Sequence, residues 1–322
     1  MTIDLQAAVA AARAPLASPT ERIGGQGAAQ APRFELFHAP NSICSQKVRA
    51  VLAHHGLAYT SNTMSIVAGE TYLPGYVRLR MHACDQAGLP LADVHTGSTA
   101  VTTGGCDPAV VPTLVDWATG QVVIDSKRIC IYLDDIAGGA LKLRPDATAR
   151  AVDAELDLVD SLPNYQMLVG RAPDPQRHGA SPRAGTGVQF AMGKVARCDR
   201  YLAEFASDAD LQRGYGAKRA KELSAAEKLF TPEAMQAAYA QAEAACAQLE
   251  QTLVAGGSPW IFGDAVSMAD LFWAIELLRM KNLGAHTLWE DGLRPHVAGY
   301  VRRCEAAPAI RTAVIEWPGA LH

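Results

Sequence analysis

Features that would point to several classes of protein are missing from this sequence. Its 322 residues carry a net charge of −4 and no polybasic cluster, which argues against a nucleic-acid partner and an anionic membrane surface. No apolar run is long enough to cross a bilayer. No two cysteines have the C-x-x-C spacing of a zinc ribbon or a dithiol redox motif. What is left is a soluble globular protein, and 49% hydrophobic with 19% charged residues is typical of that class.

The cysteines are odd in number, seven, and irregularly spaced. Because a chain of this size can bury a core without disulfides, we expect reduced thiols in a cytoplasmic protein. The cluster His82, Cys84, His95 and Cys106 raises the question of a metal. Its spacings match no standard site, so we expect no metal and interpret residues 82–108 as a surface loop or lid.

The chain divides by composition into three parts. Residues 1–32 are rich in alanine and lack the pattern of a secretory signal, so we expect a flexible arm with helical potential over residues 5–12. Residues 33–138 alternate strand and helix patterns. Residues 147–316 are predicted to be almost wholly helical, and the glycine- and proline-containing stretch before them reads as a linker. The length also favours two domains.

Residues 42–49 join an expected strand at 33–38 to an expected helix at 45–56. Cys44 would then lie in the first turn of a helix, where free N–H groups and the helix dipole favour a thiolate. Lys47 and Arg49 would add positive charge nearby. The alternative is a buried cysteine that only packs.

Two further motifs follow in the first domain. In Val110-Val111-Pro112-Thr113, the proline would interrupt a strand, and a cis peptide bond is one way to accommodate it. Asp125 and Ser126 would begin a helix and could bind a ligand amine. Residues 33–136 are therefore predicted to form a β-α-β-α-β-β-α unit. In the second domain, Ser267-Met268-Ala269-Asp270 predicts a capped, buried central helix.

These motifs, in this order and spacing, resemble the cytosolic glutathione S-transferases over residues 33–315: Ser-x-Cys-Ser at 42–45, Val-Pro-Thr at 111–113 and Asp-Ser at 125–126. The tetrachlorohydroquinone reductive dehalogenases are similar, and so is the zeta class with its maleylacetoacetate isomerases. The resemblance implies a thioredoxin-like domain followed by a helical bundle. Residues 82–108 are an insertion beside the expected active site, where they could reshape the substrate pocket.

The resemblance also implies a role for each motif residue. Val111, before a cis Pro112, would pair through its backbone with the cysteinyl part of glutathione. Asp125 and Ser126 would hold its γ-glutamyl amine and carboxylate. Ser42 would donate a hydrogen bond to the glutathione thiolate. Glutathione would be a co-substrate, no metal is implied, and the family suggests a homodimer that acts on a small aromatic or quinone-like molecule.

Cys44 would act as a second nucleophile and form a mixed disulfide with glutathione. That reaction fits reductive dehalogenation or thioether or ether cleavage. Two alternatives stay open: a zeta-type cis-trans isomerase, in which Ser42 is essential and Cys44 dispensable, and a non-catalytic glutathione-binding protein. In the helical domain, Trp273, Met280 and Tyr165 could line the second-substrate pocket or simply pack in the core. We interpret Arg279 as part of a solvated helix face.

Overall fold

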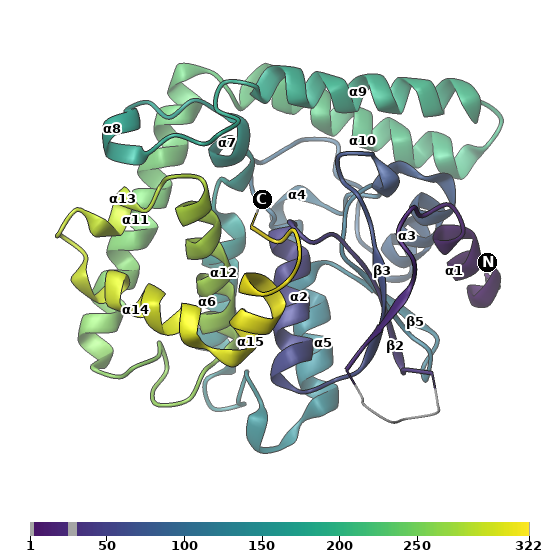
Figure 1. Ribbon diagram of the computed structural model, residues 1–322. Helices are drawn as coiled ribbons and strands as arrows, with labels where there is room; N and C mark the ends of the chain where they lie inside the picture. Colours follow the sequence, from purple (N-terminus) through teal and green to yellow (C-terminus); the bar gives the residue numbers. More distant parts are fainter. Residues whose placement is uncertain (1–2, 25–30, 322) are drawn as a thin grey trace.

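A five-stranded mixed sheet organises the first part of the chain (Figure 1). The computed structural model describes residues 3–24 and 31–321. The strands stand in the order β1-β3-β2-β4-β5, in which β2 and β3 are parallel and every other pair is antiparallel. Their bounds are β1 (Glu21–Ile23), β2 (Phe34–His38), β3 (Tyr59–Thr63), β4 (Thr113–Asp116) and β5 (Gln121–Ile124).

Helices cover both faces of this sheet because successive strand residues point to opposite sides. Leu36 and Leu114 pack on the face covered by α2 and α5, whereas Phe37 and Val115 pack on the face covered by α1 and α3. The bounds are α1 (Leu5–Arg13), α2 (Ile43–His54), α3 (Pro74–Gln86) and α5 (Ser126–Ala137). From β2 to α5 the elements follow the predicted β-α-β-α-β-β-α order. The fold class predicted from the sequence is confirmed.

The N-terminal segment is not the flexible arm predicted for residues 1–32, of which 1–2 and 25–30 lie outside the described residues. Helix α1 packs on α3, with Val9 and Ala12 buried, and β1 extends the sheet beyond β3. The two helices approach each other closely, because a Cβ on Gly75 of α3 would lie 2.4 Å from the backbone oxygen of Ala11 of α1. The absence of a side chain at Gly75 allows this contact. A salt bridge of 2.7 Å from Arg13 to the buried Glu35 holds the segment to β2.

The second part of the chain is helical, as predicted. Its elements are η2 (Gly139–Leu141), α6 (Ala149–Ser161), α7 (Asn164–Val169), α8 (Pro175–His178), α9 (Gly187–Glu204), α10 (Ala209–Lys228), α11 (Pro232–Gly256), α12 (Met268–Asn282), α13 (Thr287–Glu290), α14 (Pro295–Ala306), α15 (Pro308–Ile310) and η3 (Arg311–Ile315). Ser267 and Asp270 form the predicted capping box, and α12 is the buried central helix. Helices α9 and α10 form a long antiparallel pair (Figure 1). Over residues 3–24 and 31–321, no helix combines the length and apolarity needed to span a membrane.

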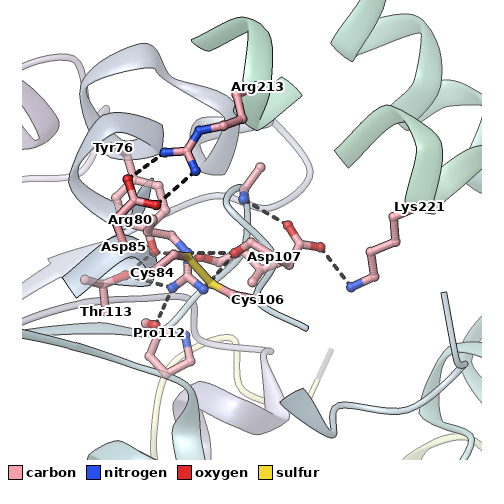
Figure 2. Close-up of a disulfide and its surroundings, with 12 residues drawn as sticks. Tyr76, Arg80, Cys84, Asp85, Cys106, Asp107, Pro112, Thr113, Arg213 and Lys221 are labelled. Carbon is pink, nitrogen blue, oxygen red and sulfur yellow. Dashed lines mark hydrogen bonds and ion pairs between the residues drawn. A yellow bond between two sulfur atoms is a disulfide. The ribbon is translucent and has the colours of Figure 1, made fainter. Parts of the chain in front are cut away.

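The inserted stretch is partly regular and is closed by a disulfide (Figure 2). Helix α3 runs past the predicted start of the insertion to Gln86, and α4 (Val101–Gly104) is a short turn of helix. A disulfide joins Cys84 of α3 to Cys106, so the prediction of reduced thiols was wrong for this pair. The two sulfurs are therefore bonded to each other and not available as thiolate ligands. The described part of the chain contains no group of three His, Cys, Asp or Glu side chains that could hold a metal.

Side chains from both parts of the molecule hold the C-terminal end of the insertion, which leads into β4. Arg80 of α3 donates to the Asp107 carbonyl at 2.8 and 3.0 Å and to the Pro112 carbonyl at 2.7 Å (Figure 2). The Asp107 carboxylate accepts from Lys218 at 2.7 Å and from Lys221 at 3.0 Å, both on α10. The insertion is thus an ordered bridge between the sheet and the helical part.

Candidate active site

The register of the sheet brings the three motifs to one end of it. Phe37 of β2 pairs with Thr113 of β4, and Thr113 pairs with Ile124 of β5. The residues just beyond these pairs therefore lie side by side: the turn that follows His38, then Pro112, then Asp125. All three motifs predicted from the sequence meet at this end. The Val111–Pro112 peptide bond is cis, as predicted.

Ser42 and Cys44 lie at the start of α2. Ser42 is the N-cap, and its hydroxyl oxygen accepts a hydrogen bond of 3.3 Å from the Ser45 backbone N–H. Capping uses the oxygen of Ser42 as an acceptor and leaves its O–H proton available for donation. Cys44 occupies the first helical turn with a partly buried side chain, and it has no disulfide partner.

A buried ion pair lies beside the cysteine. Lys47, one helical turn from Cys44, makes a salt bridge of 2.6 Å with Asp160 of α6; the two side chains are 0% and 5% exposed. The Lys47 ammonium also lies 4.5 Å from the centre of the Phe272 ring on α12. From the insertion, the Thr99 hydroxyl donates to the Asp160 carboxylate at 3.2 Å and its N–H donates to the Asp160 carbonyl at 3.0 Å. The insertion thereby contacts the carboxylate that holds Lys47.

The surroundings of Cys44 shift the pKa of its thiol in opposite directions. Burial raises the pKa of the thiol above its ordinary value, whereas the Lys47 ammonium and a hydrogen bond with the Ser126 hydroxyl lower it. Asp160 and Asp125 raise it further. The expectation of a lowered thiol pKa was therefore wrong for this state of the protein, because burial outweighs the helix start and Lys47. Because these groups lie close to the thiol, a change in burial or in their charge would change its pKa.

Asp125 and Ser126 begin α5, as predicted. Asp125 has a φ of 71°, which is uncommon for a residue other than glycine, and its carboxylate accepts from the Arg128 N–H at 3.4 Å. Burial and the nearby Asp160 raise the pKa of Asp125 to about 6. Backbone strain of this kind costs roughly 1–3 kcal/mol and clusters at functional sites.

Two family models match the sequence: glutathione S-transferase, N-terminal domain, at residues 41–136, and glutathione S-transferase, C-terminal domain, at residues 232–303. The 2,5-dichlorohydroquinone reductive dechlorinase of Sphingobium indicum is 39% identical over 292 residues, which is 89% of this chain and 84% of that protein. The chain belongs to the glutathione S-transferase family.

Solved structures of this family share the fold. The β-etherase LigF from Sphingobium sp. strain SYK-6 superposes with a TM-score of 0.54 at 16% identity, covering 87% of this chain and 98% of that one. The glutathione transferase URE2P6 from Phanerochaete chrysosporium gives 0.53 at 16% identity, with 88% and 94% covered. At these identities the likeness concerns the fold alone. Neither family model reaches α9 and α10.

Arg49 does not add charge near the thiol, contrary to the expectation from sequence. It turns away from Cys44 and donates to the Ala39 carbonyl at 3.1 Å, the Pro40 carbonyl at 2.9 Å and the Ala313 carbonyl at 2.9 and 3.1 Å. Gln46 donates to the Ala320 carbonyl at 2.9 Å. Both side chains tie the turn before Cys44 to the segment after α15, which Figure 1 places beside the start of α2. No sequence pattern signalled this clamp.

Arg279 and Glu276 of α12 were missed as members of the site. Arg279 is partly buried, not solvated as predicted, and its guanidinium donates to the carbonyl of Asn41, the residue before Ser42. Glu276 is fully buried and is an electrostatic neighbour of both Arg279 and Lys47. A charged pair spaced by three residues within a mostly apolar stretch of the helix was the available signal.

The other proposed pocket residues are core side chains. Trp273 is fully buried with its indole N–H donating to Glu155 at 2.8 Å, and Met280 is also buried. Tyr165 donates to the Glu222 carboxylate at 2.8 Å and stacks on His95 of the insertion at 4.3 Å between ring centres. Packing is therefore the better interpretation for Trp273 and Met280, while Tyr165 helps to seat the insertion.

Proposed function

We propose that this chain is a glutathione-dependent enzyme that reductively removes halide from a halogenated hydroquinone. The observation that carries the proposal is the position of Cys44, at a helix start beside Lys47 and Ser126, in a chain 39% identical to a hydroquinone reductive dechlorinase over 89% of its length. A reduction of this kind needs a protein thiol beside the bound glutathione sulfur. The predicted cytoplasmic location and homodimer belong to the proposal.

The glutathione half of the site follows from the convergence of the motifs. Val111 offers its backbone beside the cis bond to Pro112. Asp125, once ionised, binds the γ-glutamyl ammonium, and Ser126 with the first N–H groups of α5 binds the adjacent carboxylate. The O–H of Ser42 donates to the glutathione thiolate and lowers its pKa.

The chemistry then proceeds in three steps. The keto tautomer of the hydroquinone accepts the glutathione thiolate, halide leaves with the carbon–halogen electron pair, and a ring thioether results. The Cys44 thiolate attacks the glutathione sulfur; the sulfur–ring bond breaks, and its electron pair takes a proton at the ring carbon. A second glutathione attacks the Cys44–glutathione disulfide, which restores the thiol and releases oxidised glutathione. Two glutathione molecules supply the two electrons that replace halide by hydrogen.

Mass spectrometry after a single turnover tests the proposal. We expect an adduct of one glutathione on Cys44 and release of halide from a dichlorinated hydroquinone. Cys44→Ser should stop at the ring thioether. Cys198→Ala, which removes a buried thiol of α9, is the matched control and should keep both events. Full dehalogenation by Cys44→Ser would exclude the mixed-disulfide mechanism.

A zeta-type isomerisation is the second candidate. Burial raises the pKa of Cys44, while Ser42 keeps a proton to donate, which favours a reaction that uses glutathione and Ser42 alone. In that reaction glutathione adds to a cis double bond, the adduct rotates, and glutathione leaves. Isomerase activity that survives in Cys44→Ser and is lost in Ser42→Ala would favour this candidate.

A further inference from the structure

Helix α12 brings a positive charge to the turn that carries Cys44. The Arg279 guanidinium donates to the Asn41 carbonyl, three residues before Cys44 in sequence. Charge on Cys44 and on Glu276 would stabilise the Arg279 cation, so both lie within its electrostatic reach. Glu276 and Arg279 share one face of the helix because residues three apart are neighbours. Besides the carboxylate of Asp160, the helical domain thus contributes a cation to the site.

This cation is not neutralised within the described residues. Arg279 has no salt bridge there, and the bond to Asn41 is the single hydrogen bond that its side chain makes to them. A guanidinium has five N–H donors and stays protonated, so four donors remain for another acceptor. Lys47 provides the contrast, because Asp160 neutralises it at 2.6 Å. An unpaired and partly buried charge is costly unless a ligand of opposite charge completes it.

Glu276 does not pair with Arg279 through a hydrogen bond within the described residues. Its side chain is fully buried, and neither of its carboxyl oxygens has a hydrogen-bond partner among residues 3–24 and 31–321. Burial raises the pKa of Glu276, against the influence of Lys47, Arg279 and the nearby Asn164 amide, so the carboxyl holds its proton more firmly than usual. When it is protonated, this carboxyl can donate a hydrogen bond beside Arg279. Arg279, and Glu276 in its protonated form, are suited to an oxygen that carries negative charge.

The other charges around Arg279 agree with this picture. Arg183, from the loop before α9, adds a second positive charge that opposes ionisation of the Arg279 guanidinium. Lys47 and Asp160 pair with each other, so Lys47 does not add an unpaired positive charge. The positive charge that stays without a salt bridge on α12, within the described residues, is that of Arg279.

We infer that Arg279, with Glu276, binds an ionised oxygen of the aromatic second substrate, so that the site selects phenolates over neutral aromatic molecules. The inference rests on the proposed function for the identity of the reaction, but the binding can be measured without turnover. A phenolate is richer in electron density than a phenol, so its ring takes up the proton that forms the keto tautomer. When the glutathione thiolate adds to that tautomer, charge returns to an oxygen, and a fixed guanidinium stabilises it.

A coloured phenol gives a direct test. 4-Nitrophenol is titrated with the protein, saturated with S-methylglutathione, at a pH where the free phenol is mostly neutral. We expect the absorption of the phenolate to grow on binding. Loss of one charge-assisted hydrogen bond costs about 1.5–3 kcal/mol, so Arg279→Met should weaken binding about 10- to 150-fold and abolish the growth in phenolate. Lys281→Met, on the same helix with its side chain 45% exposed, is the matched control and should behave as wild type.

Calorimetric binding of S-methylglutathione checks that each variant is folded. If Arg279→Met fails this check, Arg279→Gln decides, because glutamine keeps a donor for Asn41 without the charge. Phenolate binding that is equally strong without the charge, or no phenolate binding by the wild type, overturns the inference. Phenolate binding that depends on Arg279 in a protein that releases no halide would instead refute the proposed function and leave the inference standing.

Discussion

The buried pair of Lys47 and Asp160 leads to a quantitative prediction. At 2.6 Å and an effective dielectric constant of about 20, the attraction between the two charges is about 6 kcal/mol. Desolvation of both groups offsets most of it, but removing one partner leaves the other charge buried and unpaired. Lys47→Met should therefore lower the free energy of unfolding by about 3–5 kcal/mol, a large share of the 5–15 kcal/mol typical of a folded protein.

The same substitution should change the thiol. The Lys47 ammonium lowers the pKa of Cys44 and Asp160 raises it, so Lys47→Met removes the favourable charge and keeps the unfavourable one. The pKa of Cys44 should rise, and its alkylation by iodoacetamide should move to higher pH. In the double variant Lys47→Met/Asp160→Leu both charges are gone. We expect it to regain most of the lost stability while its thiol keeps a pKa above that of wild type, because the Lys47 charge acts on the thiol more strongly than the Asp160 charge.

Urea denaturation gives the stability of the three proteins, and mass spectrometry of trapped Cys44 gives the pH profile of the thiol. The double variant serves as the control for lost packing, since it also lacks the lysine side chain. A loss of less than 1 kcal/mol in Lys47→Met would show that the pair is not buried as the structure has it. An unchanged alkylation profile would refute the electrostatic link between Lys47 and Cys44.

Three further predictions concern other parts of the site. Because the pKa of Asp125 is about 6, kcat/KM for glutathione should fall about tenfold per pH unit below that value as the carboxylate is protonated. Asp125→Asn should flatten this pH profile. If kcat/KM falls in the variant too, the fall belongs to another group. Unfolded but unreduced protein should titrate five thiols and reduced protein seven, whereas seven in both would exclude the disulfide of Cys84 and Cys106. Arg80→Lys cannot make the bidentate contact with Asp107, so glutathione affinity should fall several-fold by calorimetry; unchanged affinity would separate this clamp from the site.

The sequence predicted much of the fold because local signals and packing agree there. A proline in an otherwise apolar strand, an Asp-Ser helix start and a serine-capped α2 each specify a local geometry, and their order specifies the sheet. The capping box at Ser267 and Asp270 marked the start of α12 for the same reason. Such signals act over a few residues, which is the range that a sequence shows directly.

The parts that were not predicted depend on contacts between distant segments. Cys84 and Cys106 are separated by 22 residues, and nothing in that spacing shows that the end of the insertion lies beside α3. The alanine-rich N-terminus resembled a disordered arm because its partner surface is α3. Arg279 was placed in solvent because helical periodicity shows which face is apolar and not which polar residue meets another domain.

The clamp by Arg49 and Gln46 has a consequence for how the protein is made. These residues donate to carbonyls 264 and 274 positions further along the chain. A ribosome therefore completes the turn that carries Cys44 long before it has synthesised the groups that hold that turn in place. Throughout most of its synthesis the nascent chain presents a nucleophile without its clamp. A separately expressed first domain would stay in that unfinished condition, so the two domains form one functional unit even though only one of them carries the thiol.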